Sequence, residues 1–149
     1  MIRLLDMNSL SDAEAVIAVQ KPAYQAEADL IGYDGIPGLS DSASVLKECG
    51  ETFFGHVENE VVCGVISFKM VHRTMDIHRL VVHPDFFRRR IATRLLAHVS
   101  QLKDVKRLEV STAAENHPAV AFYGKSGFRL SKQLRTNDGL PLVKLEKFM

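Results

Sequence analysis

The sequence lacks an excess of charge of either sign. Nineteen Lys and Arg residues stand against eighteen Asp and Glu residues, for a formal net charge of +1 at pH 7. A chain so balanced has no global basic field that would hold nucleic acid or an anionic membrane. Any binding of anions must therefore be local.

Long apolar runs and cysteines are also scarce. The longest mostly apolar stretch, residues 61–68, is far shorter than the roughly 20 residues that cross a bilayer. The first residues lack the apolar run and cleavage site of a signal peptide. The two cysteines, Cys49 and Cys63, have no partner at metal-ligand spacing, and a disulfide between them would not make a secreted scaffold. We therefore expect a cytoplasmic protein with reduced thiols, no metal site and no membrane partner.

What is present is an ordinary globular composition. The 149 residues are 46% hydrophobic and 25% charged, which fits one domain over residues 1–149 with one layered core.

The first third of the chain reads as helical and rich in loops. After a short strand at residues 2–5, Ser11 and Glu14 form a capping-box pattern that predicts a helix over residues 12–30. Pro22 predicts a bend or break in this helix. A glycine-rich loop follows at residues 32–38, and Ser40 is placed to cap a second, short helix.

Strands dominate the middle of the chain. We predict strands over residues 52–57, 61–71 and 74–82 from their β-branched and aromatic content. In the third strand the apolar positions change parity between Ile77 and Leu80. This change indicates either a β-bulge or an unbroken strand with an exposed Arg79.

The remaining third alternates helices with strands. Apolar residues from Ile91 to Leu102 recur at helical spacing, and Pro118 and Gly127 delimit a helix over residues 118–125. Strands are predicted over residues 107–112, 128–134 and 140–147, the last two joined by a turn at residues 137–139. Mixed α/β architecture follows from this order.

The first segment with a chemical signal opens the helix after His83-Pro84. Arg88, Arg89 and Arg90 lie where a helix dipole disfavours cations, and a bound phosphate would relieve that conflict. The alternative is that the three arginines solvate a surface turn or pair with carboxylates.

The second segment follows the strand at residues 107–112. Asn116 lies just outside a helix start, where its amide could reach the amide groups of a ligand. Tyr123, on the same helix, is either a functional residue or an ordinary core residue.

Together the two segments resemble the GNAT superfamily of N-acetyltransferases, which use acetyl-CoA. The family's nucleotide-binding pattern, Gln/Arg-x-x-Gly-x-Gly/Ala, falls on Phe87, Arg90 and Ala92, and only Ala92 matches. The second pattern, Asn-x-x-Ala-x-x-Phe-Tyr-x-x-x-Gly-Phe, is nearly complete. It is carried by Asn116, Ala119, Phe122, Tyr123, Gly127 and Phe128.

The resemblance implies a single-domain GNAT-like α/β fold. Its mixed sheet would have six to seven strands, splayed between strands 4 and 5 and flanked by about four helices. Backbone groups of Leu80, Val81 and Val82 would pair with the pantetheine arm of acetyl-CoA, and Asn116 would contact it. The pyrophosphate would lie over the residues that open the helix, namely Arg88, Arg89, Arg90, Ile91, Ala92 and Thr93.

The resemblance also implies the catalytic roles. Tyr123 matches the tyrosine that contacts the cofactor and protonates its departing thiolate, and Asp76 or His78 would serve as general base toward the acceptor amine. A glycine is the usual residue at the position of Arg90, so the geometry of the loop is an open question.

The acceptor is expected to be a primary amine of a small molecule or peptide. Glu27, Tyr33, Asp34 and Ile36 would face it. Nucleic acid is not expected as a partner, because the charge is balanced, and a homodimer is one expected assembly. The alternative to an enzyme is a non-catalytic protein that binds acyl-CoA with the same fold.

Overall fold

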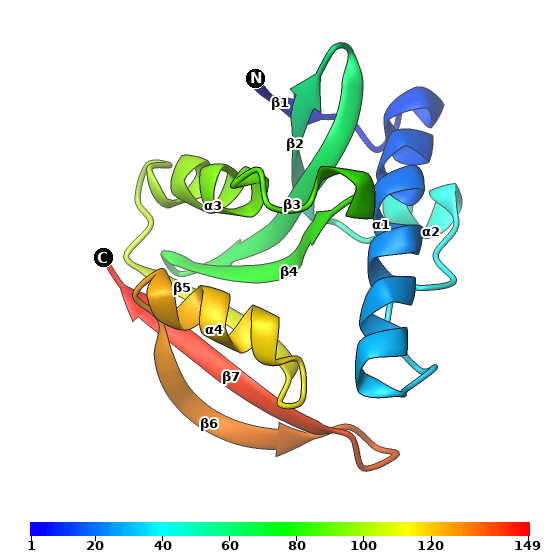
Figure 1. Ribbon diagram of the computed structural model, residues 1–149. Helices are drawn as coiled ribbons and strands as arrows, with labels where there is room; N and C mark the ends of the chain where they lie inside the picture. Colours follow the sequence, from blue (N-terminus) through cyan, green and yellow to red (C-terminus); the bar gives the residue numbers. More distant parts are fainter.

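A seven-stranded mixed sheet runs through the computed structural model, which describes residues 1–149 (Figure 1). The strand order is β1-β2-β3-β4-β5-β7-β6. All neighbouring pairs are antiparallel except β4 and β5, which are parallel. The strands are β1 (Ile2–Leu5), β2 (Thr52–Glu58), β3 (Val61–Val71), β4 (Thr74–Val82), β5 (Arg107–Ala113), β6 (Arg129–Arg135) and β7 (Pro141–Phe148).

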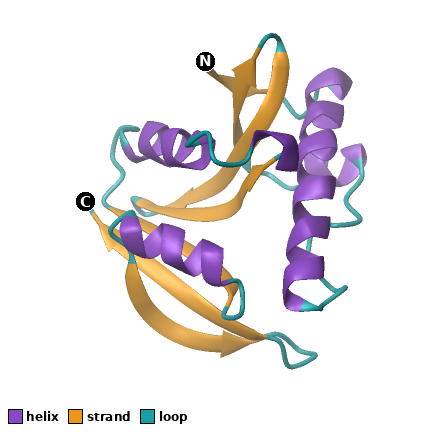
Figure 2. Ribbon diagram, viewed as in Figure 1, coloured by secondary structure: helices purple, strands orange, loops and turns teal.

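Helices cover both faces of the sheet (Figure 2). The helices are α1 (Leu10–Ile31), α2 (Ala43–Glu48), α3 (Ile91–Ser100) and α4 (His117–Lys125), with a short 3-10 helix η1 (Pro84–Phe86) after β4. One core of 8 buried residues lies under α1 and α2, and the other, of 15, lies under α3 and α4. The predicted mixed α/β architecture is confirmed, with seven strands and four α-helices. None of these helices combines the length and apolar character needed to cross a membrane.

The helix starts differ from the sequence expectation by a few residues. Ser9, not Ser11, caps α1, because Ser9 has extended backbone and its Oγ accepts a hydrogen bond from Asp12 N at 3.3 Å. Asp12, not Glu14, supplies the carboxylate, which accepts from Asp6 N. Likewise Ser42, not Ser40, caps α2.

Pro22 does not break α1, which runs continuously from Leu10 to Ile31. The proline removes one backbone donor, but the helix buries Val16 and Val19 before it and Ala28 after it. Packing on both sides of the proline thus outweighs the lost hydrogen bond.

The parity change in β4 is a β-bulge at His78. Ser67 of β3 pairs with Arg79 and Phe68 pairs with Ile77, so His78 has no opposite residue. Arg79 is only 9% exposed, which rules out the alternative of an exposed arginine in an unbroken strand. The bulge keeps Met75, Ile77 and Leu80 against one core while Arg79 faces the other.

The parallel strands β4 and β5 separate beyond the bulge. Their pairing begins at Thr74↔Arg107 and ends at Ile77↔Val110, although β4 continues to Val82 and β5 to Ala113. The sheet therefore splays between strands 4 and 5, as the resemblance implied.

Candidate active site

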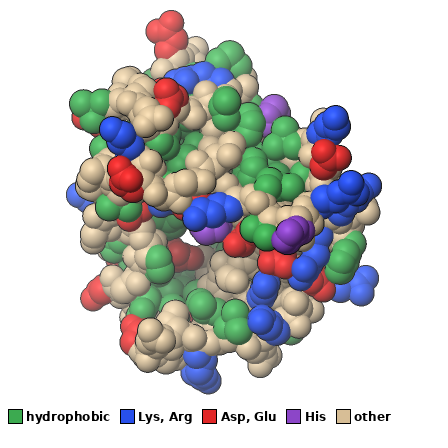
Figure 3. Space-filling view, turned by 180° about the vertical axis from the view of Figure 1, so that it is seen from behind, with side chains coloured by type: hydrophobic (Ala, Val, Ile, Leu, Met, Phe, Trp, Pro, Cys, Tyr) green, Lys and Arg blue, Asp and Glu red, His purple; other side chains and the backbone are tan.

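The gap between the splayed strands is a cleft of about 420 Å³. Its walls come from α1, the loop after α1, β4, β5, α4 and the end of the β6–β7 hairpin. Figure 3 shows a hollow near the middle of the back face, with acidic, basic and histidine side chains around its edge. The cleft thus joins residues from both ends of the chain.

One wall of the cleft is the unpaired half of β4. Leu80, Val81 and Val82 line it, while their other edge pairs with β3 at Ile66, Val65 and Gly64. Opposite them, Ser111, Thr112 and Ala113 of β5 line the cleft. An extended ligand with amide groups would fit between two strands that no longer pair with each other.

The loop from η1 to α3 leaves backbone donors free. The first intrahelical bond of α3 runs from Arg94 N to Arg90 O at 3.0 Å. The amides of Ile91, Ala92 and Thr93 have no hydrogen-bond partner, and no side chain caps the helix. Free amides at the positive end of a helix dipole form a binding site for phosphate groups.

Arg90 adopts the conformation that a glycine would take at this position. Its φ is 59° and its ψ is 24°, in the left-handed region, and Arg88 also has a positive φ of 66°. The arginine therefore retains the backbone turn at the cost of strain.

The three arginines of this loop are exposed, but they do not all face the same way. Arg89 Nη1 lies 3.6 Å from Glu58 Oε1, and its guanidinium stacks 5.1 Å from the centre of the Phe86 ring. Arg88 and Arg90 have no ion pair. Pairing with a carboxylate, one of the two sequence alternatives, thus applies to Arg89 alone.

Tyr123 lies at the floor of the cleft, 5% exposed. Its ring packs edge-on against Phe122 and Phe128. Burial raises the pKa of its phenol, and the nearby Tyr24 and Glu27 raise it further. Tyr123 therefore keeps its proton at neutral pH, as a proton donor must.

Asn116 lines the cleft and also fixes the start of α4. Its Oδ1 accepts a hydrogen bond from Ala119 N at 3.2 Å, and its Nδ2 donates to Glu27 Oε2. One hydrogen on Nδ2 remains for a ligand. The side chain thus connects α4 with α1 across the cleft.

The structure separates the two candidate bases. His78, on the bulge, lines the cleft, whereas Asp76 does not. His78 Nε2 lies 3.1 Å from Asp76 Oδ2, and its Nδ1 lies 3.4 Å from Glu51 Oε2. Asp76 thus reaches the cleft through its contact with His78.

A buried polar network lies behind the cleft and was not expected from the sequence. Arg79 pairs with Glu51 and, at 2.9 Å, with Asp41. Its Nε also donates to Gln20 Oε1 at 3.1 Å. Burial alone would lower the pKa of Arg79, but the bonds and charges of Asp41 and Glu51 outweigh it and raise that pKa. With two carboxylates for one guanidinium, the network carries a net negative charge.

Tyr24 is a second lining residue that the sequence reasoning missed. Burial raises the pKa of its phenol, although the Arg79 charge opposes this shift. Gln20, Tyr24 and Glu27 recur at i, i+4 and i+7 and so share one face of α1. Polar residues on this otherwise apolar face of α1 could have indicated that the face lines a polar site.

The residues expected around the acceptor divide into two groups. Glu27 and Ile36 line the cleft, whereas Tyr33 and Asp34 do not. Tyr33 Oη instead donates to Asp138 Oδ2 at 2.5 Å, which links the loop after α1 to the β6–β7 turn.

Comparison with known proteins gives a family and a relative. The sequence model of the acetyltransferase (GNAT) family matches residues 13–128. The chain is 38% identical over 143 residues to the UPF0157 protein YqkA of Bacillus subtilis (strain 168). This match covers 95% of the chain but 42% of YqkA, so the chain spans less than half the length of this curated relative.

Solved structures show the same fold at low identity. The PaiA N-acetyltransferase of Thermoplasma acidophilum, in complex with coenzyme A, has a TM-score of 0.79 and 18% identity over 100% of this chain and 99% of that chain. The ribosomal-protein-S18-alanine N-acetyltransferase of Escherichia coli has a TM-score of 0.79 and 19% identity over 99% of this chain and 92% of that chain. At these identities the likeness concerns the fold.

Proposed function

Because the chain belongs to the acetyltransferase (GNAT) family, we propose that it is an N-acetyltransferase, which moves an acetyl group from acetyl-CoA to a primary amine of a small molecule or peptide. The observation that carries this proposal is the set of free amides at Ile91, Ala92 and Thr93, placed beside the unpaired half of β4. A pyrophosphate on those amides leaves the pantetheine arm directed along Leu80–Val82 into the cleft.

The cofactor is held by backbone groups more than by side chains. Leu80, Val81 and Val82 would hydrogen-bond the amides of pantetheine as a neighbouring strand would. The remaining hydrogen of Asn116 Nδ2 would bind the same arm. Arg88 and Arg90, which have no ion pair, would add positive charge around the phosphates, and Arg89 would join them on leaving Glu58.

The reaction is direct attack in a ternary complex of enzyme, acetyl-CoA and amine. The neutral amine nitrogen attacks the thioester carbonyl carbon, and the oxyanion that forms accepts a hydrogen bond from the Val81 or Val82 amide. The C–S bond then breaks, and the thiolate takes the proton of Tyr123, which regains a proton from solvent when the products leave; His78 likewise releases the amine proton to solvent. His78 would accept a proton from the amine at Nε2, directly or through a water, once this nitrogen leaves the Asp76 carboxylate, while Glu51 holds Nδ1 and orients the ring.

The cleft has the charge that a cationic amine needs. Glu27 lines it, and the network of Arg79, Asp41 and Glu51 behind it is net negative. An amine of pKa about 10 arrives protonated at neutral pH, so acidic surroundings would draw it in before His78 removes its proton. We therefore favour amines that carry a second positive charge.

The test is thiol release from acetyl-CoA in the presence of a panel of amines, with dicationic and monocationic members matched in length. We expect turnover with at least one acceptor and preference for dicationic amines. Protection of the protein by CoA, with no turnover on any acceptor, would instead favour the non-catalytic acyl-CoA-binding protein.

Variants distinguish chemistry from binding. Tyr123→Phe should lower kcat by about 10- to 100-fold while the affinity for CoA stays unchanged, because a thiol of pKa near 8.5 needs only modest help to leave. Asn116→Ala and Arg88→Ala should weaken CoA binding. An unchanged rate in Tyr123→Phe at every pH would remove this residue from the mechanism.

A truncated cofactor provides the matched comparison for the phosphate loop. Arg88→Ala should reduce the affinity for acetyl-CoA but not for acetyl-pantetheine, which lacks the pyrophosphate. Arg129→Ala, which changes an exposed arginine on β6 without an ion pair, serves as the control and should change neither affinity.

The cytoplasmic location and the homodimer stay predictions, to be tested by fractionation and by sedimentation.

A further inference from the structure

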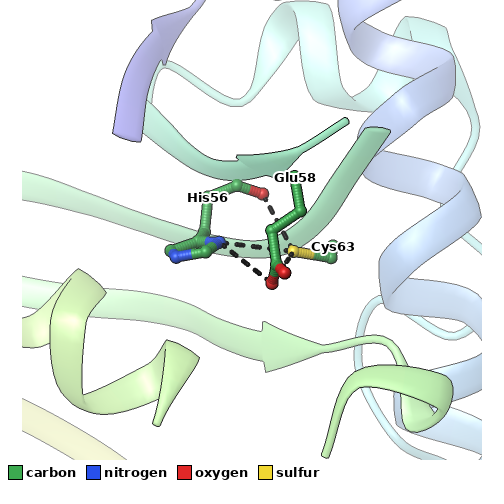
Figure 4. Close-up of side chains that lie close together, drawn as sticks. All are labelled: His56, Glu58 and Cys63. Carbon is green, nitrogen blue, oxygen red and sulfur yellow. Dashed lines mark hydrogen bonds and ion pairs between the residues drawn. The ribbon is translucent and has the colours of Figure 1, made fainter. Parts of the chain in front are cut away.

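Three side chains with metal-binding atoms meet on the β2–β3 hairpin, outside the cleft (Figure 4). His56 and Glu58 alternate along β2 and so point to the same face of the sheet. Cys63 of β3 joins them through a β-bulge, because His56 pairs with Gly64 and Val57 with Val62, which leaves Cys63 unpaired. The bulge therefore brings together three side chains whose spacing in the sequence does not predict a metal site.

The donor atoms are already close to the separations that a metal ion requires. Cys63 Sγ lies 3.3 Å from His56 Nδ1 and 3.6 Å from Glu58 Oε2, and Nδ1 lies 3.9 Å from that oxygen. Tetrahedral zinc, with bonds of about 2.0–2.3 Å, holds its ligand atoms roughly 3.3–3.6 Å apart. Small side-chain rotations would complete the coordination.

Burial favours a site over a chance surface cluster. Cys63 is 0% and His56 4% exposed, whereas Glu58, at the end of the strand, is half-buried and opens to solvent. An ion would thus enter past Glu58 and meet two preformed ligands inside. None of the three residues lines the cleft, so the proposed transferase reaction leaves them unused.

The charges set a condition on which ions fit. Arg89 lies 3.6 Å from Glu58 Oε1, and Arg94 and the N-terminal amine act on His56. A divalent cation is stable beside these positive charges only if its ligands neutralise it, as the thiolate of Cys63 and the carboxylate of Glu58 together would. Because Oε1 faces Arg89 while Oε2 faces the cysteine, the arginine can hold Glu58 from outside the site.

We propose that His56 Nδ1, Glu58 Oε2 and Cys63 Sγ bind one thiophilic divalent cation of the zinc class. Thiolate and imidazole ligands select zinc over magnesium and calcium, and three protein ligands leave one position for water. Binding replaces the S–H bond of Cys63 by a sulfur–metal bond and releases one proton to solvent.

The experiment uses the full chain after removal of metal with a chelator. Cobalt(II) is added as the spectroscopic probe, and zinc affinity is measured by competition with a chromophoric chelator. We expect one ion per chain, a thiolate-to-cobalt absorption band, and about one proton released per zinc in weakly buffered solution. Absence of the band, or binding without stoichiometry, would overturn the proposal.

Variants identify the ligands. Cys63→Ala should abolish the cobalt band, and Glu58→Gln should weaken zinc binding by at least about 100-fold, the upper end of what loss of an outer partner costs. Cys49→Ser is the matched control, since Cys49 is the other free thiol, donates to Leu46 O and caps the C-terminal end of α2. A band that survives in Cys63→Ala or disappears in Cys49→Ser contradicts the assignment.

Glu58→Gln keeps the test decisive if Cys63→Ala fails to fold. Glu58 is half-buried, so its amide variant should retain the circular dichroism and melting temperature of the metal-free chain. Zinc should raise the melting temperature of the wild type but not of this variant. Equal shifts in the two proteins would show that zinc binds elsewhere.

Discussion

At the scale of single residues, Arg90 combines a strained backbone with a place in the proposed phosphate site. Its side chain replaces the family glycine, yet its φ of 59° preserves the turn that opens α3. The free amides of Ile91, Ala92 and Thr93 depend on this turn, so the arginine has not closed the proposed phosphate site. Conformation and residue type are separable here.

Arg90→Gly tests that separation. The substitution should relieve about 1–2 kcal/mol of strain in the left-handed backbone conformation. This gain should exceed the roughly 0.4–1 kcal/mol of stability that is lost because glycine makes the unfolded chain more flexible. We expect the free energy of unfolding, measured by urea denaturation, to rise by up to about 1.6 kcal/mol, with CoA still bound. Loss of CoA binding would show that the guanidinium, not the amides, carries the affinity.

Asp12 shows a different residue-scale effect, in which a charge stabilises a helix start. The hydrogen bond from Arg3 and the backbone amide of Asp6 lower the pKa of this carboxyl. A group whose folded pKa is depressed stabilises the fold above its unfolded pKa of about 3.9, and this contribution disappears as the pH falls through the folded pKa.

Asp12→Asn should therefore destabilise the protein at pH 7 by about 0.5–1 kcal/mol, the range for a charge at a helix N-terminus. The difference from wild type should shrink below about pH 4 and vanish once Asp12 itself is protonated. Thermal melts at pH 7 and at pH 3 measure it. Glu14→Gln, on the same helix but exposed and unpaired, is the control, and an equal effect there would contradict the assignment.

At the scale of elements, α3 rests directly on β3 at Gly64. A Cβ added at Gly64 would lie 2.5 Å from Ile91 Cγ2 and 3.3 Å from Leu95 Cδ1. Ile91 is the first residue of α3 and carries one of the free amides. The height of this helix above the sheet therefore sets the position of the proposed phosphate site.

Gly64→Ala should lower the free energy of unfolding by about 1–3 kcal/mol, the usual cost of overpacking, and should weaken CoA binding by displacing the start of α3. Gly124→Ala is the matched control, because nothing lies within 4 Å of an added Cβ on α4. That change should raise stability by about 0.5–1 kcal/mol, since alanine favours helix. Urea denaturation and CoA titration of both variants provide the measurements. Undiminished CoA binding in Gly64→Ala would argue against a coupling between the packing of α3 on β3 and the proposed phosphate site.

At the scale of the whole molecule, two parts of the sheet are joined by a short parallel ladder. Strands β1–β4 and strands β5–β7 pair with each other only from Thr74↔Arg107 to Ile77↔Val110. Beyond it, the cleft is closed by α1, by the link between Asn116 and Glu27, and by the link between Tyr33 and Asp138. A ligand between the splayed strands would act as an additional connection.

CoA binding should therefore slow amide hydrogen exchange in segments covering residues 78–93, which hold the free edge of β4 and the phosphate loop. Segments covering residues 129–135 of β6, at the far edge of the sheet, should not change and serve as the internal control. At a CoA concentration 100 times its Kd, the protein should also gain about 2.7 kcal/mol of stability. Protection confined to β6, or none at all, would contradict the placement of CoA in the cleft.

Local patterns in the sequence determined the elements and the candidate cofactor segments. The strands at residues 61–71 and 74–82 were predicted with their observed bounds, because β-branched content and turn residues act over a few neighbours. The parity change between Ile77 and Leu80 left two alternatives, and only pairing with β3 decided for the bulge. The Ser11–Glu14 pattern predicted the wrong cap, because only the backbone conformation shows that the helix begins after Ser9.

Only the tertiary structure decided which distant side chains meet. Arg79, Asp41 and Glu51 come from three separate segments, and His56, Glu58 and Cys63 meet through a bulge that depends on strand register. Long-range packing brings such side chains together, and its free energy is spread over the whole core. The sequence near these residues therefore shows no periodic pattern that would predict their contact. Strand alternation and the pattern of the candidate phosphate loop are short-range and can be read from the chain, whereas the exact helix caps, the buried charge network and the cluster of candidate ligands require the fold.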